Sequence, residues 1–129
     1  MIPEDLRYTR EHEWIRVEGG AGVVGITDHA QDALGDVTFV ELPVEGAELT
    51  KGEEACAIES AKAAVSIYAP AGGKVVAANE ALEDDPGLVN TSPFGEGWIY
   101  KLELADPSEI ASLMDAAGYA AFLAAEEEQ

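Results

Sequence analysis

One lysine in the middle of the chain combines a nucleophilic amine with unusually small neighbours. It lies in Glu59-Ser60-Ala61-Lys62-Ala63, and residues 54–59 read as a short strand before it. Residues 64–69 alternate between apolar and polar positions, which is typical of a second strand. Lys62 is therefore predicted at the tip of a hairpin. Nothing bulky beside it would hinder an enzyme that modifies its amine.

Few other residues could do chemistry. Cys56 is the only cysteine, so no intrachain disulfide can form. It lies in an apolar segment and is expected to be a small buried hydrophobe. The two histidines, His12 and His29, have no metal-ligand spacing or nucleophile motif around them. The sequence therefore predicts no metal site and no catalytic residue. An independent enzyme remains the alternative, and turnover by the isolated protein would reveal it.

Charge excludes some classes of partner. The chain has 129 residues, with 7 basic and 26 acidic side chains and a net charge of −19. Such a field repels phosphates, so we expect no nucleic-acid partner and no anionic membrane partner. No signal peptide or membrane span is evident, which favours a cytoplasmic protein. A mature organellar protein would look the same. We expect a single domain over residues 1–129 and a monomer.

Short strands separated by turn residues predict a mostly β fold, a sandwich or flattened barrel. The predicted strands are a hairpin in 12–26, a strand in 36–42, the central hairpin in 54–69, and strands in 74–78 and 98–104. A short helix is predicted from Asp28 to Gly35, with Asp28 and Gln31 as a capping pair. Residues 80–97 are predicted as loop. A C-terminal helical segment at 107–125 should dock Tyr119 and its apolar neighbours on the sheet.

The lysine stretch resembles the attachment site of lipoyl domains, which carry Glu-Ser or a similar pair, one spacer and the modified lysine. Further matches are Gly46, Leu49, Gly52, Ile58, Ile67, Ala69-Pro70, Gly73 and Val75. Biotinyl domains share this architecture but flank their lysine with Met, which is absent beside Lys62. Lipoate is therefore preferred over biotin. Gly73 is expected at a positive φ opposite the hairpin.

Segments outside the hairpin resemble the H-protein of the glycine cleavage system, in order along nearly the whole chain. They are Tyr8-Thr9, His12-Glu13-Trp14, residues 25–31, 34–36 and 39–43, Val89-Asn90, Pro93 and residues 95–98. The resemblance implies a lipoyl/biotinyl-type β-sandwich with a short internal helix and C-terminal helices. One departure is that many family members carry an acidic residue near Val65-Ser66, and this chain does not.

The resemblance also implies a role. The protein would be a non-catalytic lipoyl carrier, with lipoate joined to Lys62 as an amide. It would shuttle the aminomethyl group of glycine between enzymes of one system. The implied partners are glycine decarboxylase with pyridoxal phosphate, aminomethyltransferase with tetrahydrofolate, dihydrolipoyl dehydrogenase with FAD, and a lipoylating enzyme. Two alternatives stay open: a lipoyl or octanoyl relay in lipoate biosynthesis, and a lipoyl domain serving a 2-oxoacid dehydrogenase.

Three further residues are candidates beside Lys62. Glu59, three residues earlier, is expected to help the lipoylating enzyme recognise the hairpin. Glu13 is expected to line the cleft that shelters the loaded arm, where a carboxylate would keep the cargo amine protonated. A neutral amine can expel the sulfur, whereas an ammonium cannot. His29 is a weaker candidate for a second wall. The competing interpretation of Glu13 is a solvated residue at the start of a strand.

Overall fold

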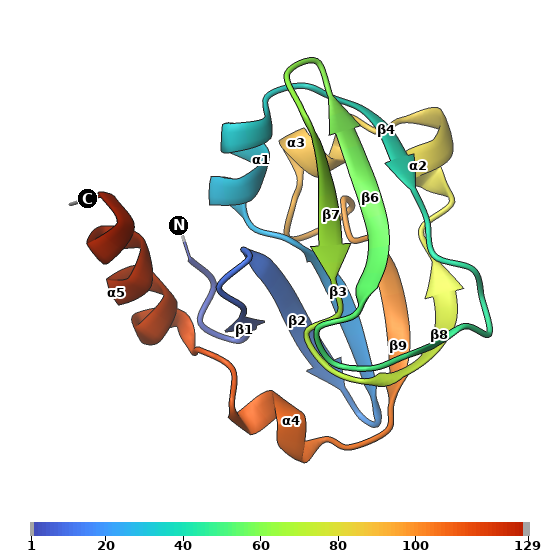
Figure 1. The fold of residues 1–129 in the computed structure, drawn as a ribbon, viewed down its shortest axis with the longest axis vertical. Coiled ribbons are helices and arrows are strands. Elements are labelled where there is room, and N and C mark those ends of the chain that lie inside the picture. The colour runs from blue at the N-terminus through green and yellow to red at the C-terminus, as the bar shows by residue number, and fades with distance from the viewer. Residues whose placement is uncertain (1, 128–129) are drawn as a thin grey trace.

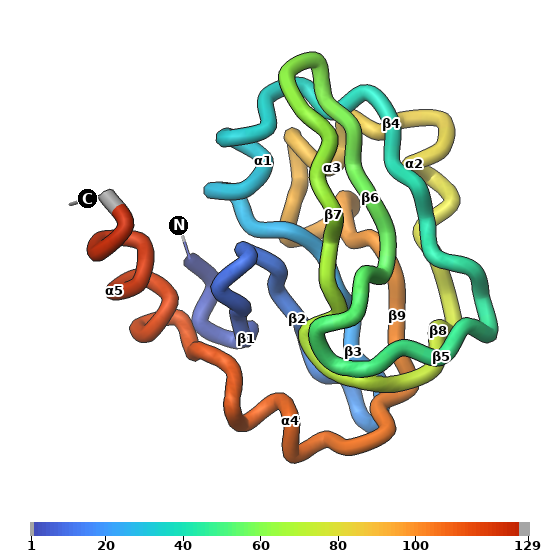
Figure 2. The backbone as a smooth tube through the Cα atoms, viewed as in Figure 1, coloured from blue at the N-terminus to red at the C-terminus, as the bar shows by residue number. Residues whose placement is uncertain are grey.

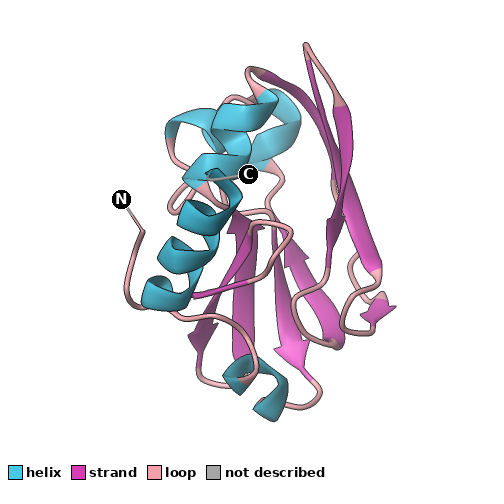
Figure 3. Ribbon diagram, turned by 60° about the vertical axis from the view of Figure 1, so that its left-hand side comes forward, coloured by secondary structure: helices cyan, strands magenta, loops and turns pink. Residues whose placement is uncertain are grey.

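Two antiparallel sheets pack face to face in the computed structural model, which describes residues 2–127 (Figure 1). The six-stranded sheet has the order β1 (Arg7–Tyr8), β2 (Glu13–Glu18), β3 (Ala21–Ile26), β9 (Tyr100–Leu104), β8 (Gly73–Ala78) and β5 (Glu48–Leu49). The three-stranded sheet has the order β4 (Val37–Glu41), β6 (Glu54–Ser60) and β7 (Ala64–Tyr68). Seen from the side, the two sheets form separate layers (Figure 3). The predicted mostly β sandwich is confirmed.

The main core lies between these layers. In the smaller sheet, β6 buries Cys56 and Ile58 and β7 buries Ile67, against Val24 and Leu102 of the larger sheet. Burying a side chain of this size stabilises the fold by roughly 1.5–3 kcal/mol. Cys56 is the buried hydrophobe that its apolar segment predicted. Burial raises the pKa of its thiol to about 12, so the reactive thiolate is not available.

Short helices join the strands. They are α1 (Asp28–Leu34), α2 (Ala81–Asp84), α3 (Leu88–Thr91), α4 (Ser108–Ala111) and α5 (Ala116–Glu127). The prediction of a loop throughout 80–97 is wrong, because α2 and α3 occupy part of it. Each is only four residues long, which is too short for a periodic pattern to emerge. The cap of α1 is Thr27, one residue earlier than expected, since its hydroxyl accepts a hydrogen bond from the Ala30 amide.

The C-terminal segment returns to the beginning of the chain. Tyr8 and Met114 exchange two backbone hydrogen bonds of 2.8 and 3.0 Å, and α5 runs alongside β1 (Figure 2). Tyr119 is buried there in a second cluster with Tyr8 and Trp14. The expectation that Tyr119 docks is confirmed. The same cluster contains Tyr8, Trp14 and Val23, which belong to β1, β2 and β3 of the larger sheet.

Gly73 does not have the expected positive φ. A Cβ at this position would lie 2.2 Å from the carbonyl oxygen of Glu103 on the neighbouring β9 strand. Glycine is therefore required by the close approach of two backbones and not by a left-handed conformation. Within residues 2–127, no helix is long and apolar enough to cross a membrane.

Candidate functional site

The tip of the β6–β7 hairpin is closed by the side chain of Ser60. Its hydroxyl oxygen accepts hydrogen bonds from the amides of Lys62, at 3.2 Å, and Ala63, at 3.1 Å. The Ser60 amide donates to the Ala63 carbonyl at 2.8 Å. A serine suits this turn because its hydroxyl oxygen accepts hydrogen bonds from backbone amides that would otherwise lack an acceptor in the tight bend. Lys62 is exposed at the tip, where the sequence predicts it.

The tip of the β6–β7 hairpin contacts the C-terminal end of α1. The Ala61 amide donates to the Asp36 carbonyl at 3.2 Å, which joins the hairpin to the chain just after α1. Gly35 ends the helix with a φ of 76°, and a Cβ there would come within 3.0 Å of Lys62 Cε. The glycine thus makes room for the stem of the lysine. The β6–β7 tip and the C-terminal end of α1 are neighbours in the fold (Figure 1).

A mostly apolar pocket opens beside this tip, between α1, β7 and the turn before β2. It has a volume of about 280 Å³. Its lining is Glu11, His12, Ile26, Ala30, Ala33, Leu34, Ala63, Val65, Ser66 and Ile67. We call it the α1 pocket. It combines an aliphatic interior with a few polar groups, which is the usual composition of a small-molecule site.

His12 forms part of the wall of the α1 pocket in an unusual backbone conformation, with a φ of 70°. Its Nδ1 lies 2.8 Å from the Tyr119 hydroxyl, and its Nε2 lies 3.4 Å from a carboxylate oxygen of Glu126. Burial lowers the pKa of His12, and the nearby His29 ring lowers it further, against the opposing charges of Glu126 and Glu11. The imidazole is therefore biased towards its neutral form.

Glu13 lies behind the lining of the α1 pocket and not in it. The residue is 1 % exposed, so the interpretation as a solvated carboxylate at a strand start is wrong. One carboxyl oxygen accepts from the Thr9 hydroxyl at 2.6 Å and the other from the Tyr68 amide at 2.9 Å. Burial raises the pKa of Glu13 to about 7, although both hydrogen bonds oppose the shift.

The other two candidates lie outside the pocket. Glu59 is exposed near the end of β6, paired with Ala64 on one side and Phe39 on the other. His29 is exposed on α1, and its ring centroid is 4.6 Å from that of His12. It lines a neighbouring groove together with Phe94. His29 therefore contacts a residue of the wall without forming the wall itself.

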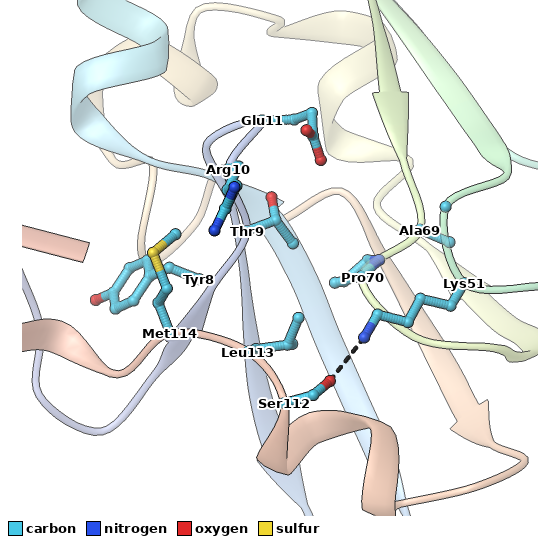
Figure 4. Close-up of a pocket in the computed structure, with 11 residues that line it drawn as sticks. Tyr8, Thr9, Arg10, Glu11, Lys51, Ala69, Pro70, Ser112, Leu113 and Met114 are labelled. Carbon is cyan, nitrogen blue, oxygen red and sulfur yellow. Dashed lines mark hydrogen bonds between the residues drawn. The ribbon is translucent and has the colours of Figure 1, made fainter. Parts of the chain in front are cut away.

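Glu11 borders two cavities. Besides the α1 pocket, it lines a more polar pocket between the N-terminal segment and the Ala69–Pro70 turn (Figure 4). Lys51 and Arg10 enter that second pocket from different elements, and Lys51 donates to the Ser112 hydroxyl at 2.7 Å. Among residues 2–127, Glu11 forms no ion pair. Its carboxylate is thus not neutralised by a basic side chain of the described residues.

Sequence reasoning missed most of the lining of the α1 pocket. Ala30, Ala33 and Leu34 carry no chemical group that a motif search would select. Their only signal is their spacing, which puts small and apolar side chains on one face of a short helix. Glu11 was missed because nothing in its neighbourhood distinguishes it from the other acidic residues.

Comparisons with known proteins agree with one another. A family model described as glycine cleavage H-protein matches residues 6–126. A glycine cleavage system H protein of Symbiobacterium thermophilum is 57 % identical over 121 residues, covering 94 % of each chain. One of Beijerinckia indica is 60 % identical over 117 residues, covering 91 % of this chain and 94 % of the relative. The crystal structure of a glycine cleavage system H protein from Mycobacterium marinum superposes with a TM-score of 0.88, at 39 % identity, covering 95 % of this chain and 99 % of the other.

Proposed function

Because the chain belongs to the glycine cleavage H-protein family, the lipoyl carriers of the glycine cleavage system, we propose that Lys62 is its lipoylated residue. We propose further that the α1 pocket receives the end of the arm. The observation that carries this proposal is the position of Lys62, exposed at a hairpin tip with its stem against Gly35, beside an apolar pocket. An arm leaving this lysine has a cavity next to it.

The residues present suit a lipoyl group. Lipoate is an aliphatic chain that ends in a cyclic disulfide, and Ile26, Leu34, Val65 and Ile67 offer an aliphatic surface. When bound, the group supplies a strained disulfide that opens readily to a nucleophile. The nucleophile for that step comes from a partner enzyme. Cys56 is buried with a raised pKa and takes no part.

The chain's own residues hold and shelter the cargo. Glu11 lines the α1 pocket, where its carboxylate would keep a cargo amine protonated. This is the role that the sequence analysis gave to Glu13. The burial of Glu13 favours an indirect role, in which its bond to the Tyr68 amide fixes the strand that carries Val65 and Ile67. Glu59, exposed three residues before Lys62, is available to the lipoylating enzyme.

We infer that the protein is a carrier without catalytic activity of its own. Its partners would be glycine decarboxylase, aminomethyltransferase and dihydrolipoyl dehydrogenase, besides the lipoylating enzyme. A net charge of −19 favours basic docking surfaces on these enzymes. Within residues 2–127, no group of three or more potential ligands is arranged to hold a metal ion.

Intact mass and peptide mapping of protein purified after coexpression with a lipoylating enzyme test the attachment. The added mass of one lipoyl group should map to Lys62. Lys62→Arg keeps a charge and most of the side-chain length but cannot form the amide. This variant should fold normally, stay unmodified and fail to support glycine cleavage. Modification mapped to Lys51, Lys74 or Lys101 instead would refute the assignment.

A further inference from the structure

The hydroxyl of Tyr119 bridges two elements that contribute to the α1 pocket. Its oxygen is 2.8 Å from Nδ1 of His12, which lines the pocket from the turn before β2. It is also 2.7 Å from Oγ1 of Thr27, the cap of α1. The next turns of α1 supply Ala30, Ala33 and Leu34 to the opposite wall. A residue near the C-terminus thus contacts both elements that form the pocket.

One set of hydrogen bonds satisfies all of these groups. Thr27 Oγ1 accepts from the Ala30 amide at 3.3 Å and can give its proton to Tyr119. Tyr119 then donates to Nδ1 of His12, which leaves the imidazole proton on Nε2, facing Glu126. Each donor has an acceptor in this arrangement. It requires the neutral imidazole, and burial favours that form.

The imidazole of His12 needs such support. A positive φ is uncommon for a residue other than glycine and persists where the surroundings hold it in place. The backbone contributes through the Thr27 amide, which donates to the His12 carbonyl at 2.9 Å. That bond holds the main chain but leaves the ring free to rotate about its side-chain torsions. Within residues 2–127, Tyr119 is the hydrogen-bond partner of Nδ1.

We propose that Tyr119 is a positioning residue of the carrier: its hydroxyl holds the His12 imidazole and the Thr27 cap so that the α1 pocket retains the loaded arm. The helix α5 then joins the turn that carries His12 to the start of α1. The proposal rests on the proposed function, since it takes the arm to occupy this pocket. Stacking of Tyr119 on Tyr8, with ring centroids 4.6 Å apart, fixes the phenol from its other side.

Tyr8 provides a matched control. It belongs to the same buried stack, and its hydroxyl donates to the carbonyl of Pro3, away from the α1 pocket. Tyr119→Phe and Tyr8→Phe therefore each remove one hydroxyl from the same cluster and keep the ring.

The first readout needs no lipoate. In unlipoylated protein at about pH 8, where an imidazole with an ordinary pKa is already neutral, the nitrogen chemical shifts of His12 report its tautomer. The wild type and Tyr8→Phe should carry the proton on Nε2. Tyr119→Phe should keep the proton on Nε2, which faces Glu126, but should shift the Nδ1 resonance because Nδ1 has lost its donor. An Nδ1 chemical shift unchanged in Tyr119→Phe would overturn the proposal.

The second readout is the release of ammonia from lipoylated protein loaded with the aminomethyl group, without aminomethyltransferase. Tyr119→Phe should release ammonia roughly fivefold to tenfold faster than the wild type, the factor expected when one hydrogen bond is lost. Tyr8→Phe should match the wild type. If Tyr8→Phe is as fast as Tyr119→Phe, general loosening of the cluster explains the effect and the proposal fails.

A variant that fills the α1 pocket distinguishes a failure of the Tyr119 role from a failure of the proposed arm site. Ala33 is an exposed residue of the lining, so Ala33→Trp should fill the cavity with little disturbance of the core. Faster release from Ala33→Trp with unchanged release from Tyr119→Phe would overturn the role of Tyr119 alone. Unchanged release from Ala33→Trp would show that the arm does not use the α1 pocket, and both proposals would fall. Faster release of ammonia from both variants supports both proposals.

Discussion

The buried carboxyl of Glu13 accepts a hydrogen bond of 2.9 Å from the backbone amide of Tyr68 and so links the two sheets. Glu13 begins β2 in the larger sheet, and Tyr68 ends β7, an edge strand of the smaller one. The amide of an edge strand has no neighbouring strand to pair with on its open side. Glu13 satisfies it and fixes the end of the strand that carries part of the α1 pocket.

The first prediction concerns stability against pH. The pKa of Glu13 is raised from 4.5 to about 7, chiefly by burial, so the folded state favours the neutral carboxyl. The folded state then binds the proton more tightly than the unfolded state. The resulting stability is fully present below pH 4.5 and is lost as the pH rises through about 7.

Glu13→Gln is neutral at every pH. Its amide oxygen can accept from the Tyr68 amide, and its amide nitrogen can donate to the Thr9 hydroxyl oxygen, as the protonated acid would. Urea unfolding at a series of pH values should therefore show the wild type losing stability relative to this variant between pH 4.5 and 7, by up to about 3 kcal/mol. Glu48→Gln, on an exposed position of β5, should show no such trend. A constant difference between the wild type and Glu13→Gln would contradict the raised pKa.

The second prediction concerns Glu11 and the protection of the cargo. A carboxylate near an amine raises the pKa of the amine and keeps it charged. Lipoylated and loaded Glu11→Gln should release ammonia several-fold faster than the wild type at about pH 8–9, and at the same rate near pH 6, where both amines are protonated. Release is measured without aminomethyltransferase. Glu103→Gln, at an exposed position of β9, serves as the control and should release ammonia at the wild-type rate. Equal release rates for Glu11→Gln and the wild type at every pH would show that Glu11 does not protect the cargo.

The third prediction concerns recognition by the lipoylating enzyme. A charge-assisted hydrogen bond to an exposed carboxylate contributes roughly 1.5–3 kcal/mol. Glu59→Ala should therefore slow lipoylation about tenfold or more, with the free energy of unfolding within about 0.5 kcal/mol of the wild type. Glu41→Ala removes another exposed glutamate from the same sheet and should be modified at the normal rate. Unchanged kinetics for Glu59→Ala would leave Glu59 as an ordinary surface carboxylate.

The fourth prediction concerns Gly73. A Cβ at this position would clash with the carbonyl oxygen of Glu103 at 2.2 Å, and backbone atoms cannot swing aside as a side chain can. Gly73→Ala should lower the free energy of unfolding by about 2–4 kcal/mol, measured in urea. Gly20→Ala, where a Cβ meets nothing within 4 Å, should change it by less than about 0.5 kcal/mol. Similar values for the two variants would show that β8 and β9 can separate at this point without cost.

Local features of this protein could be predicted from the sequence, and long-range ones could not. The lysine hairpin follows from strand alternation on both sides of Lys62, and the β-sandwich follows from many short strands. The burial of Glu13 was not predictable. A glutamate at the start of a strand is normally exposed, and its partner Tyr68 is 55 residues away. The α1 pocket was missed for the same reason, since its walls meet only in the folded chain.

The paired backbone bonds between Tyr8 and Met114 set the order in which the protein can be completed on the ribosome. The chain is synthesised from its N-terminus, so β1 emerges early and can pair with β2 at once. Its bridge to Met114 forms only when the chain 106 positions later has emerged. The β6–β7 hairpin contacts itself locally and can form much sooner. A nascent chain can therefore display Lys62 to a modifying enzyme before α5 exists, whereas the contact of Tyr119 with His12 belongs to the last step of folding.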